Sequence, residues 1–280
     1  MEAVIPYWQQ PVLRVGGLAL PAFGILVVAA VLVGRWIALR RARRFGIDPV
    51  EISSMCVWMI TAGFIGAHLV KTILPDIPTF LAHPLPTVFV RGGIASMGGF
   101  GGGLLGGILF CRRRGLSNLE TFRWLDIVAY AVPASFMFGR LGCALAHDHR
   151  GVATASWIAV RFPEGPRYDL GLIEFLFLIA LAALFYQLGR KPRLPGFFFG
   201  MLGVVYGLFR VWLDTLHIQP LRFFGGALTC AVGLAGWAAM AWFARRQPPA
   251  PRQAGSRGPQ PGPSTPAAQP HPSRRRRSAT

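Results

Sequence analysis

Residues 124–146 read WLDIVAYAVPASFMFGRLGCALA, an apolar run that is long enough to cross a lipid bilayer and yet contains Arg140. A bilayer core needs about 20 mostly apolar residues per helix. An arginine at the centre of a membrane helix costs roughly 2.5 to 3.5 kcal/mol on insertion scales, so it needs a compensating partner or a function. The run therefore predicts a transmembrane helix and, around Arg140, a site for an anionic group such as a lipid headgroup.

Similar runs account for most of the chain, which is 53% hydrophobic and only 14% charged. Because a backbone in lipid must satisfy its own hydrogen bonds, and because none of the runs alternates polar and apolar residues, helices are expected rather than a β-barrel. The predicted fold is an all-α polytopic membrane protein with seven transmembrane helices. The seven segments lie at 17–39, 53–74, 92–111, 124–146, 169–188, 196–216 and 223–244.

The basic residues predict the orientation of these helices. A net charge of +18 would suggest a nucleic-acid partner in a soluble protein, but here the positive charge follows the loops, so no nucleic acid is expected. Cytoplasmic loops carry the excess of Lys and Arg in membrane proteins. The predicted N-terminus is therefore outside and the C-terminus cytoplasmic. The residues on the predicted inner side are Arg35, Arg40, Arg41, Arg43, Arg44, Arg112, Arg113, Arg114, Arg123, Arg190, Lys191, Arg193, Arg245 and Arg246, against Arg14, Lys71, Arg91, Arg150, Arg161, Arg167 and Arg222 outside.

The two ends of the chain differ in composition. Residues 1–10 contain Glu2 and no basic cluster, so the first apolar run is expected to remain as a helix rather than to be cleaved as a signal peptide. After Arg246 the sequence is rich in Pro, Gln, Ser and Arg and cannot bury enough apolar surface to fold. We predict a membrane domain over 1–246 and a disordered Pro/Arg-rich cytoplasmic tail over 247–280.

A second arginine, Arg210, lies inside the sixth run. Tyr206, Arg210 and Asp214 follow at i, i+4 and i+8, which places them on one face of a helix, where Asp214 can neutralise Arg210. An ion pair that only fixes helix packing would explain this pattern. However, a buried ion pair seldom stabilises more than apolar residues of equal volume, which favours a functional use. A phosphodiester facing Arg210 and Arg140 together would be bound by charge-assisted hydrogen bonds.

The fourth run continues into a polar stretch, His147-Asp148-His149-Arg150, which the predicted topology places at the outer face of the bilayer. A solvated loop remains an equal alternative for His149 and Arg150. The third run is rich in glycine from Gly92 to Gly107 and includes Gly98 and Gly99. Close packing against another helix is the favoured use of these glycines. Irregular backbone whose N–H groups face a polar cavity is the alternative.

Neither a metal nor a cofactor is expected. The four cysteines show no CxxC spacing and indicate neither a disulfide framework nor a zinc site. No glycine pattern for nucleotide phosphates occurs between a soluble strand and helix. The cysteines are Cys56, Cys111, Cys143 and Cys230.

The order and spacing of these motifs, from about Leu18 to Ala244, resemble the prolipoprotein diacylglyceryl transferase family of bacterial seven-helix membrane enzymes. The element G-R-x-G-N-F-x-N-G-E-x-x-G is matched by Gly139, Arg140, Gly142, Asp148 in place of glutamate, and Gly151. The element Y-G-x-x-R-x-x-x-E is matched by Tyr206, Gly207, Arg210 and Asp214, again with aspartate for glutamate. Weaker similarities are Gly66–Leu69, His83–Leu85, Asp126, Pro133 and Leu172–Glu174.

The resemblance implies transfer of the diacylglyceryl group of phosphatidylglycerol to the lipobox cysteine of lipoprotein precursors, in the bacterial cytoplasmic (inner) membrane. Its implied partners are phosphatidylglycerol, the signal peptides of the precursors and the lipid bilayer. Arg140 and Arg210 would act on the phosphate as catalytic residues. The implied substrate-binding residues are Arg140, Asp148, Gly151, Tyr206, Asp214, Gly98 and Gly99.

Departures from the family pattern concern the activation of the thiol. The family's H-G-G histidine is replaced by Met97, and its two asparagines by Cys143 and Ala146. We expect His147 to serve as the catalytic base, oriented by the adjacent carboxylate of Asp148, with His149 and His68 as reserve candidates. Alternatively no base is needed, because a thiol of pKa about 8.5 is partly ionised at pH 7 and an arginine-rich site lowers that pKa.

Two other classes of protein stay open. In the first, Arg140 and Arg210 line an anion path in a transporter or lipid-binding protein, with the glycine-rich segment as a broken helix. In the second, the chain is a silent paralogue that keeps the lipid site without the chemistry.

Overall fold

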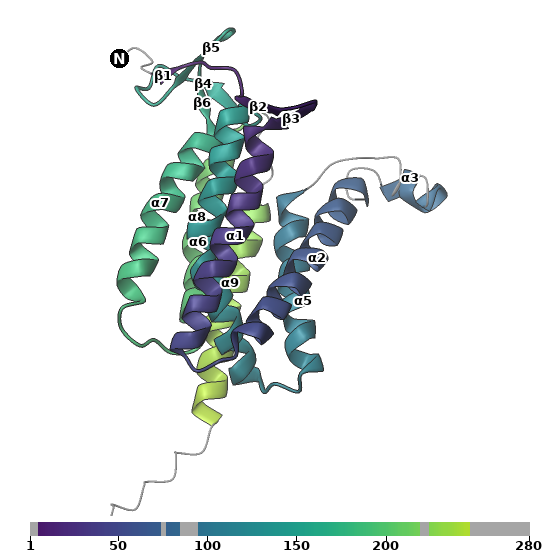
Figure 1. Ribbon diagram of the computed structural model, residues 1–280, viewed down its shortest axis with the longest axis vertical. Coiled ribbons are helices and arrows are strands. Elements are labelled where there is room, and N and C mark those ends of the chain that lie inside the picture. Colours follow the sequence, from purple (N-terminus) through teal and green to yellow (C-terminus); the bar gives the residue numbers. More distant parts are fainter. Residues whose placement is uncertain (1–4, 74–76, 85–94, 219–223, 247–280) are drawn as a thin grey trace, which may run out of the picture. The chain divides into compact units, whose positions relative to one another are not determined.

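The computed structural model describes residues 5–73, 77–84, 95–218 and 224–246, and helices make up most of them (Figure 1). Among the described residues, six helices are long and apolar enough to cross a membrane, so the chain is a polytopic membrane protein. They are α1 (Ala22–Arg44), α2 (Pro49–Ile73), α6 (Asn118–Ala146), α7 (Leu170–Leu188), α8 (Phe197–Asp214) and α9 (Phe224–Arg246). The helices α3 (Ile77–Ala82) and α5 (Ser96–Arg113) complete the helical part.

Helix α5 corresponds to the third predicted span. It is not among the six candidate spans, because its glycines, together with Arg112 and Arg113 in its last turn, lower its mean hydropathy. The count of seven membrane-spanning helices therefore stays a prediction. The tail over 247–280 lies outside the described residues, and its predicted disorder is untested.

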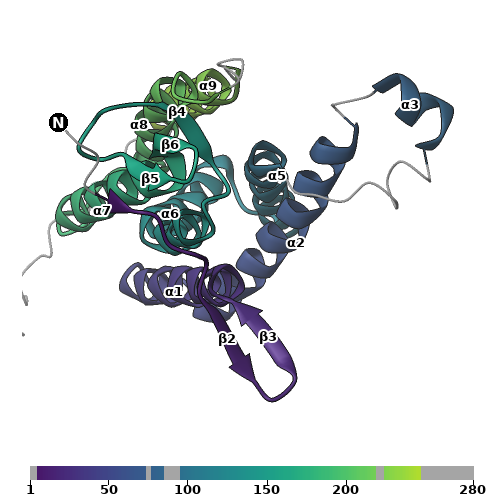
Figure 2. The same ribbon diagram turned by 90° about the horizontal axis from the view of Figure 1, so that it is seen from above.

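Helix α6 is the centre of the bundle. It contacts α1, α5, α7 and α8, and the view from above shows it between α1 and α7 (Figure 2). Its N-terminus is fixed by a capping box in which the Ser117 side chain accepts from the backbone N–H of Glu120 and the Glu120 side chain accepts from the N–H of Ser117. From this position α6 can carry Arg140 into the interior of the bundle.

Helices α2 and α5 form a close pair through the glycines of α5. A Cβ atom at Gly98, Gly102 or Gly106 would collide with backbone carbonyl oxygens of α2. Small residues at i, i+4 and i+8 let two helix backbones approach in this way. The packing interpretation of the glycine-rich segment is confirmed for Gly98, Gly102 and Gly106. The alternative of irregular backbone is wrong there, because α5 is a continuous α-helix; residues 92–94 lie outside the described part.

The all-α prediction is wrong for one end of the bundle, where the described residues form short strands (Figure 1). A four-stranded sheet has the order β1-β5-β6-β4, with β1 parallel to β5 and the other pairs antiparallel. A separate hairpin pairs β2 with β3. Hydropathy patterns cannot detect strands this short, because their stability comes from pairing with distant residues. The strands are β1 (Ile5–Pro6), β2 (Val12–Val15), β3 (Leu18–Pro21), β4 (Arg150–Ala153), β5 (Val160–Phe162) and β6 (Gly165–Asp169).

The hairpin also corrects the first predicted span. Residues 17–21, predicted as helix, belong to the turn and to β3, and α1 begins after Pro21. A proline fits just before the first helical turn because its missing N–H is not needed there. At the opposite end, α1 continues to Arg44, so basic residues predicted to lie in a loop form its last turn.

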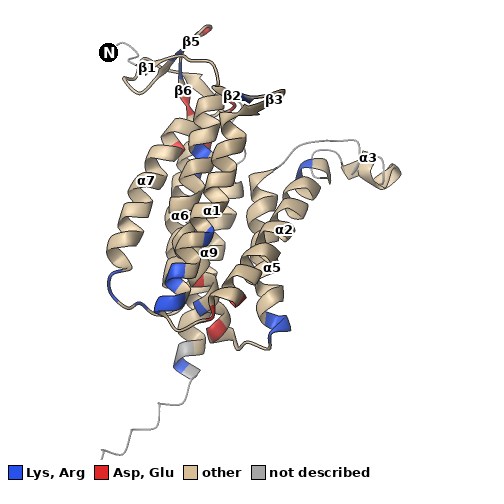
Figure 3. Cartoon of the chain, viewed as in Figure 1, with Lys and Arg blue, Asp and Glu red and all other residues tan. Residues whose placement is uncertain are grey.

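Positive charge gathers at the ends of α1 and α5 opposite the strands (Figure 3). Helix α1 ends with Arg41, Arg43 and Arg44, and α5 ends with Arg112 and Arg113. Cations at helix C-termini interact favourably with the helix dipole. The two ends of the bundle thus differ, with a small β cap at one and arginine-rich helix ends at the other.

Candidate functional site

Three charged side chains from three helices meet inside the bundle. The Nε atom of Arg140 on α6 lies 2.9 Å from Oε1 of Glu174 on α7. Nη1 of Arg210 on α8 donates a hydrogen bond of 3.1 Å to Oε2 of the same carboxylate. Arg140 and Glu174 are buried, and the side chain of Arg210 is 15% exposed. The two arginines converge, as expected, and one carboxylate of α7 joins them.

Two further residues of α8 complete this cluster. The hydroxyl of Tyr206 donates a hydrogen bond of 2.6 Å to Oε1 of Glu174. Oδ1 of Asp214 lies 3.1 Å from Nε of Arg210, which confirms the i, i+4 ion pair predicted for this helix. Two guanidinium groups are thus balanced by two carboxylates. We refer to Arg140, Glu174, Tyr206, Arg210 and Asp214 as the paired-arginine cluster.

Glu174 was not among the predicted site residues and appeared only in a weaker sequence similarity. The signal was nevertheless present, because Glu174 is a carboxylate within an apolar helix of 19 residues. The physical argument that singled out Arg140 applies equally to an acid at membrane depth. Pairing the lone acid of α7 with the two arginines would have identified it.

Cys143 connects the paired-arginine cluster to the loop after α6. Its Sγ lies 4.0 Å from Nη1 of Arg140. Ligand-type atoms of Cys143, Asp148 and His149 all lie within 4.8 Å of one another. Thiolate, imidazole and carboxylate are zinc ligands, so these are the described residues whose spacing would suit a metal ion. The spacing of cysteines along the sequence did not suggest this group.

His149 carries a positive charge at neutral pH in this arrangement. Its Nδ1 forms a short hydrogen bond with Asp148, and this bond, together with the nearby Cys143, raises the pKa of His149 to about 9. A histidine that is protonated at pH 7 cannot accept a proton there. It can instead hold a neighbouring anion.

His147 occupies a different environment, although it is adjacent in sequence. It ends α6 in the left-handed conformation, with φ of 51°, and it is buried. Its Nδ1 lies 2.6 Å from Oδ2 of Asp169. Its ring packs among Tyr7, Trp8 and Phe162, with centroid distances of 4.9, 4.7 and 5.2 Å. Among the described residues, Nε2 has no hydrogen-bond partner.

The carboxylate that orients His147 is therefore not the one predicted from the sequence. Asp148 faces His149, whereas Asp169, the N-cap residue of α7, holds His147. Burial raises the pKa of Asp169. An adjacent residue at a helix end points in another direction, so sequence proximity was a poor guide here.

The other predicted site residues have packing positions. Gly151 lies in β4, where a Cβ atom would be 2.8 Å from the carbonyl oxygen of Leu216, so only glycine allows β4 to approach the residues after α8. Gly98 packs against α2, and Gly99 together with Met97 lines an apolar cavity. His68, a reserve candidate for the base, lies on α2.

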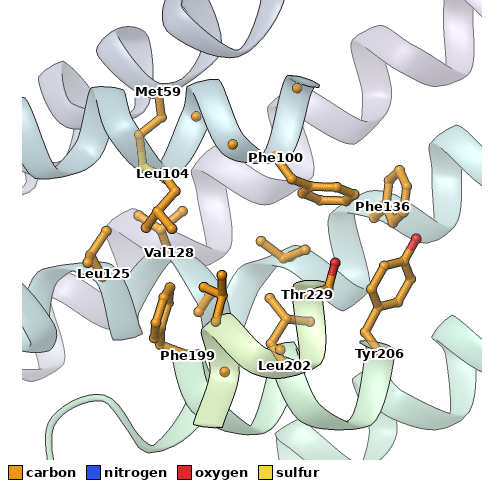
Figure 4. A pocket seen from close by; sticks show the side chains of 18 of the residues that line it. Met59, Phe100, Leu104, Leu125, Val128, Phe136, Phe199, Leu202, Tyr206 and Thr229 are labelled. Atoms are coloured by element: carbon orange, nitrogen blue, oxygen red, sulfur yellow. The ribbon is translucent and has the colours of Figure 1, made fainter. Parts of the chain in front are cut away.

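That cavity has a volume of about 420 Å³ and lies between α5, α6, α8 and α9 (Figure 4). Phe100, Phe136 and Tyr206 lie at one end, and Leu125 and Phe199 at the other. Its walls are apolar apart from the hydroxyls of Tyr206 and Thr229. Tyr206 belongs to both the cavity and the paired-arginine cluster.

Phe136 makes a second link between the two, because the guanidinium carbon of Arg140 lies 4.8 Å from the centre of its ring. The contacts described above involve Nε and Nη1 of both Arg140 and Arg210, and each guanidinium carries five N–H donors. Donors therefore remain on both groups. An amphipathic anion would find charge-assisted donors and an apolar cavity side by side.

Comparison with known proteins identifies a similar group. The family model described as prolipoprotein diacylglyceryl transferase matches residues 10–244. The chain is 28% identical over 274 residues to a phosphatidylglycerol–prolipoprotein diacylglyceryl transferase of Pseudomonas putida, covering 90% of this chain and 100% of that protein. Proteins of the same name from Symbiobacterium thermophilum and Rhizobium leguminosarum are 24% and 30% identical, over 84% and 71% of this chain and 92% and 76% of their own lengths.

Proposed function

The chain belongs to the prolipoprotein diacylglyceryl transferase family, and we propose from this premise that its paired-arginine cluster is the centre at which it lipidates lipoprotein precursors. The enzyme transfers the diacylglyceryl group of phosphatidylglycerol to the lipobox cysteine. One observation carries the assignment to this site. Arg140 and Arg210, from separate helices, are held by the same Glu174 carboxylate beside an apolar cavity.

The reaction places a defined demand on the site. The thiolate sulfur of the precursor attacks the glycerol carbon of the diacylglyceryl group, a C–S bond forms, and the C–O bond to phosphate breaks. Glycerol phosphate leaves with the electron pair, so negative charge grows on the phosphate oxygens in the transition state. The free N–H donors of Arg140 and Arg210 stabilise that charge, and Glu174 keeps the two guanidinium groups in a fixed orientation beforehand.

The lipid is positioned by the cavity next to the cluster. With the phosphate at the arginines, an acyl chain enters the space between α5, α6 and α8 past Phe136 and Tyr206. The glycines of α5 that face this space, such as Gly99 and Gly103, leave room for the chain. The signal peptide of the precursor reaches the same centre from the end that carries the strands.

His147 is the proton acceptor in this proposal, with Asp169 as its orienting residue. A carboxylate on Nδ1 leaves Nε2 as the basic nitrogen, the arrangement used by histidine bases in hydrolases. Nε2 is enclosed by Tyr7, Trp8 and Phe162, so the N-terminal strand segment must move aside for the thiol to reach it. His149, already protonated at pH 7, adds positive charge beside Cys143.

The predicted orientation completes the proposal. The arginine-rich helix ends lie in the cytoplasm, and the strands with the N-terminus lie outside, in the bacterial inner membrane. Helix α5 is the seventh spanning helix, since 18 residues extend about 27 Å, close to the thickness of a bilayer core.

The orientation is tested by introducing cysteines at Arg14 and Arg43 and measuring their reactivity toward an impermeant reagent in intact cells. Labelling at Arg43 but not at Arg14 would reverse the proposed orientation.

The activity is tested by incubating the purified full chain with phosphatidylglycerol and a lipobox peptide, followed by mass spectrometry. A mass gain of one diacylglyceryl unit is expected, and Arg210→Gln is expected to abolish it. If the folded wild-type chain yields no product and does not complement a strain without the transferase, it is a silent paralogue. The transporter alternative lost its main structural argument, because α5 is unbroken over its described length.

The base is tested by His147→Gln, with His149→Gln as the matched control. Loss of a general base typically lowers the rate about 10² to 10⁴-fold. Transfer should fall in that range for His147→Gln, and raising the pH should partly restore it because more substrate thiol is then ionised. Equal rates in wild type and His147→Gln would remove the base from the mechanism and leave spontaneous ionisation of the thiol.

A further inference from the structure

A second group of arginines lies at the end of the bundle opposite the strands, away from the paired-arginine cluster. Arg40, Arg41 and Arg44 come from the last two turns of α1. They line a cavity of about 460 Å³ whose other walls are formed by α6 and α7. Tyr130, on the α6 wall, precedes Arg140 by about 15 Å along the helix axis. We call this cavity the α1 arginine pocket.

Arg41 is the buried member of the group, with only 7% of its surface exposed. Its guanidinium carbon lies 3.8 Å from the ring centre of Tyr130 and 4.7 Å from that of Phe198. Cation–π contacts of this kind partly stabilise a buried guanidinium group. Within the described part of the chain, no hydrogen-bond partner faces its Nε.

The arginines of this pocket, Arg40, Arg41 and Arg44, make no ion pair with a carboxylate of the described residues. The acid that acts electrostatically on Arg41 is Asp126, and its Oδ1 accepts the backbone N–H groups of Phe198 and Phe199. A buried charge that lacks an ion-pair partner is unfavourable, and Asp126 acts on Arg41 without forming an ion pair with it. The pocket is therefore built to receive an anion from outside the chain.

The surroundings of the pocket indicate what kind of anion fits. Its rim carries Trp36 and Tyr186, which are 60% and 64% exposed, and such aromatic side chains are typical of the headgroup level of a bilayer. Ile37, Ala134 and Ala182 form an apolar wall between the helices. Arg44 holds the α1 and α7 ends together by donating to the carbonyl oxygens of Gly189 and Arg190. A ligand with a phosphate head and an apolar tail matches both parts.

We propose that the α1 arginine pocket binds the phosphate of an anionic phospholipid, whose apolar chain lies between α1 and α7, in the leaflet opposite to the catalytic centre. Basic pockets between membrane helices recognise anionic headgroups in this way. The lipid supplies the charge that Arg41 lacks and holds α1 against α6 and α7. This site shares no residue with the paired-arginine cluster and does not depend on the proposed reaction.

The test measures the thermal unfolding of the full chain in a neutral detergent, with phosphatidic acid, phosphatidylcholine of the same acyl chains, or inorganic phosphate added. Every variant is also made in an Arg210→Lys background, which weakens lipid binding at the catalytic cluster. Phosphatidic acid should raise the unfolding midpoint of the Arg210→Lys chain, and phosphatidylcholine and inorganic phosphate should not. An equal rise with inorganic phosphate would assign the pocket to the free ion instead.

Three variants locate the binding site. Arg41→Gln and the double variant Arg40→Gln/Arg44→Gln should lose the rise, whereas Arg43→Gln, at an exposed position on the same helix end that does not line the pocket, should keep it. Native mass spectrometry should count one anionic phospholipid fewer per chain in the first two than in Arg43→Gln. The double variant alters exposed residues only, so it decides the question even if Arg41→Gln does not fold. A full rise in the double variant would overturn the proposal.

Discussion

Arg140 and Arg41 are both buried arginines of the same bundle, but they are accommodated in opposite ways. Arg140 faces the Glu174 carboxylate at 2.9 Å, and Arg210 shares that carboxylate. Arg41 instead lies between aromatic rings and has no described carboxylate in ion-pair contact. Carboxylates fix guanidinium groups in direction, whereas aromatic faces only shield the charge.

The difference separates two uses of positive charge in a membrane protein. At the paired-arginine cluster the charge is balanced within the chain, so the guanidinium groups are held in place before a substrate arrives. Such preorganised donors can stabilise charge that appears during a reaction. At the α1 arginine pocket no described carboxylate forms an ion pair with the arginines, and binding an anion is itself the stabilising event. The first arrangement suits catalysis and the second suits a resident lipid.

The largest loss of stability is expected when the carboxylate that Arg140 and Arg210 share is removed. Glu174→Ala leaves two guanidinium groups without their shared carboxylate and Tyr206 without its acceptor. We expect a loss of about 3 to 5 kcal/mol in the free energy of unfolding, because a buried charge is then uncompensated. Chemical or thermal unfolding in detergent measures it.

The matched control for this variant is the pair Glu174→Ala/Arg140→Leu. Removing both partners should recover part of the loss, since the buried guanidinium of Arg140 is then no longer left without its carboxylate. Arg43→Gln, on an exposed helix end, gives the baseline for a surface change. If Glu174→Ala were as stable as Arg43→Gln, the carboxylate would not be the element that holds the two arginines.

Arg210→Lys should lower the free energy of unfolding less than Glu174→Ala does, but it should lower the transfer rate strongly. Lysine keeps the charge and loses the planar fork that contacts Glu174 and Asp214 together. The transfer rate should fall about 10² to 10³-fold, the usual cost of one misplaced donor to a developing anion. Mass spectrometry of the lipobox peptide gives the rate, and a cooperative unfolding transition with a midpoint near that of wild type shows that the fold is intact. A rate equal to wild type would mean that charge alone suffices.

Asp126→Ala removes the carboxylate that acts electrostatically on Arg41. Its carboxylate accepts the N–H groups of Phe198 and Phe199 at 2.6 and 3.0 Å, since the N-cap residue of α8, Gly196, has no side chain to do so. Loss of such a cap costs about 0.5 to 2 kcal/mol. The unfolding midpoint should fall accordingly and should depend more strongly on added phosphatidic acid, because Arg41 has lost its nearest negative charge. An unchanged dependence would show that Asp126 serves only α8.

The sequence predicted much of the helical bundle, because each apolar run carries its own signal. The predicted span 169–188 and the observed α7 differ by one residue, and the span 196–216 contains α8. The strands could not be predicted in this way. Val160–Phe162 and Gly165–Asp169 are too short for a periodic pattern, and β1 pairs with β5 across most of the chain.

For the site, the sequence identified the residues that are costly in lipid but not the contacts between them. Arg140, Arg210 and Asp214 were found because charge inside an apolar run is conspicuous. The Asp169 partner of His147 lies 22 residues away and depends on how β6 leads into α7. Packing between distant segments decides such pairs, and no local spacing encodes it.

The smallest effect concerns His149, at the exposed border of the site. The hydrogen bond that His149 donates to Asp148, together with the nearby Cys143, raises the pKa of His149 from 6.5 to about 9. A histidine whose pKa is higher in the folded state contributes stability that is fully present below pH 6.5 and is lost as the pH rises through about 9. The contribution is small because the two side chains are 38% and 41% exposed and screened by solvent. The difference in unfolding midpoint between wild type and His149→Gln should therefore shrink between pH 7 and about 10, and a difference independent of pH would show that His149 is not charged by its neighbour. In that case the paired charges of the site would be limited to the interior, where Glu174 holds Arg140 and Arg210 away from water.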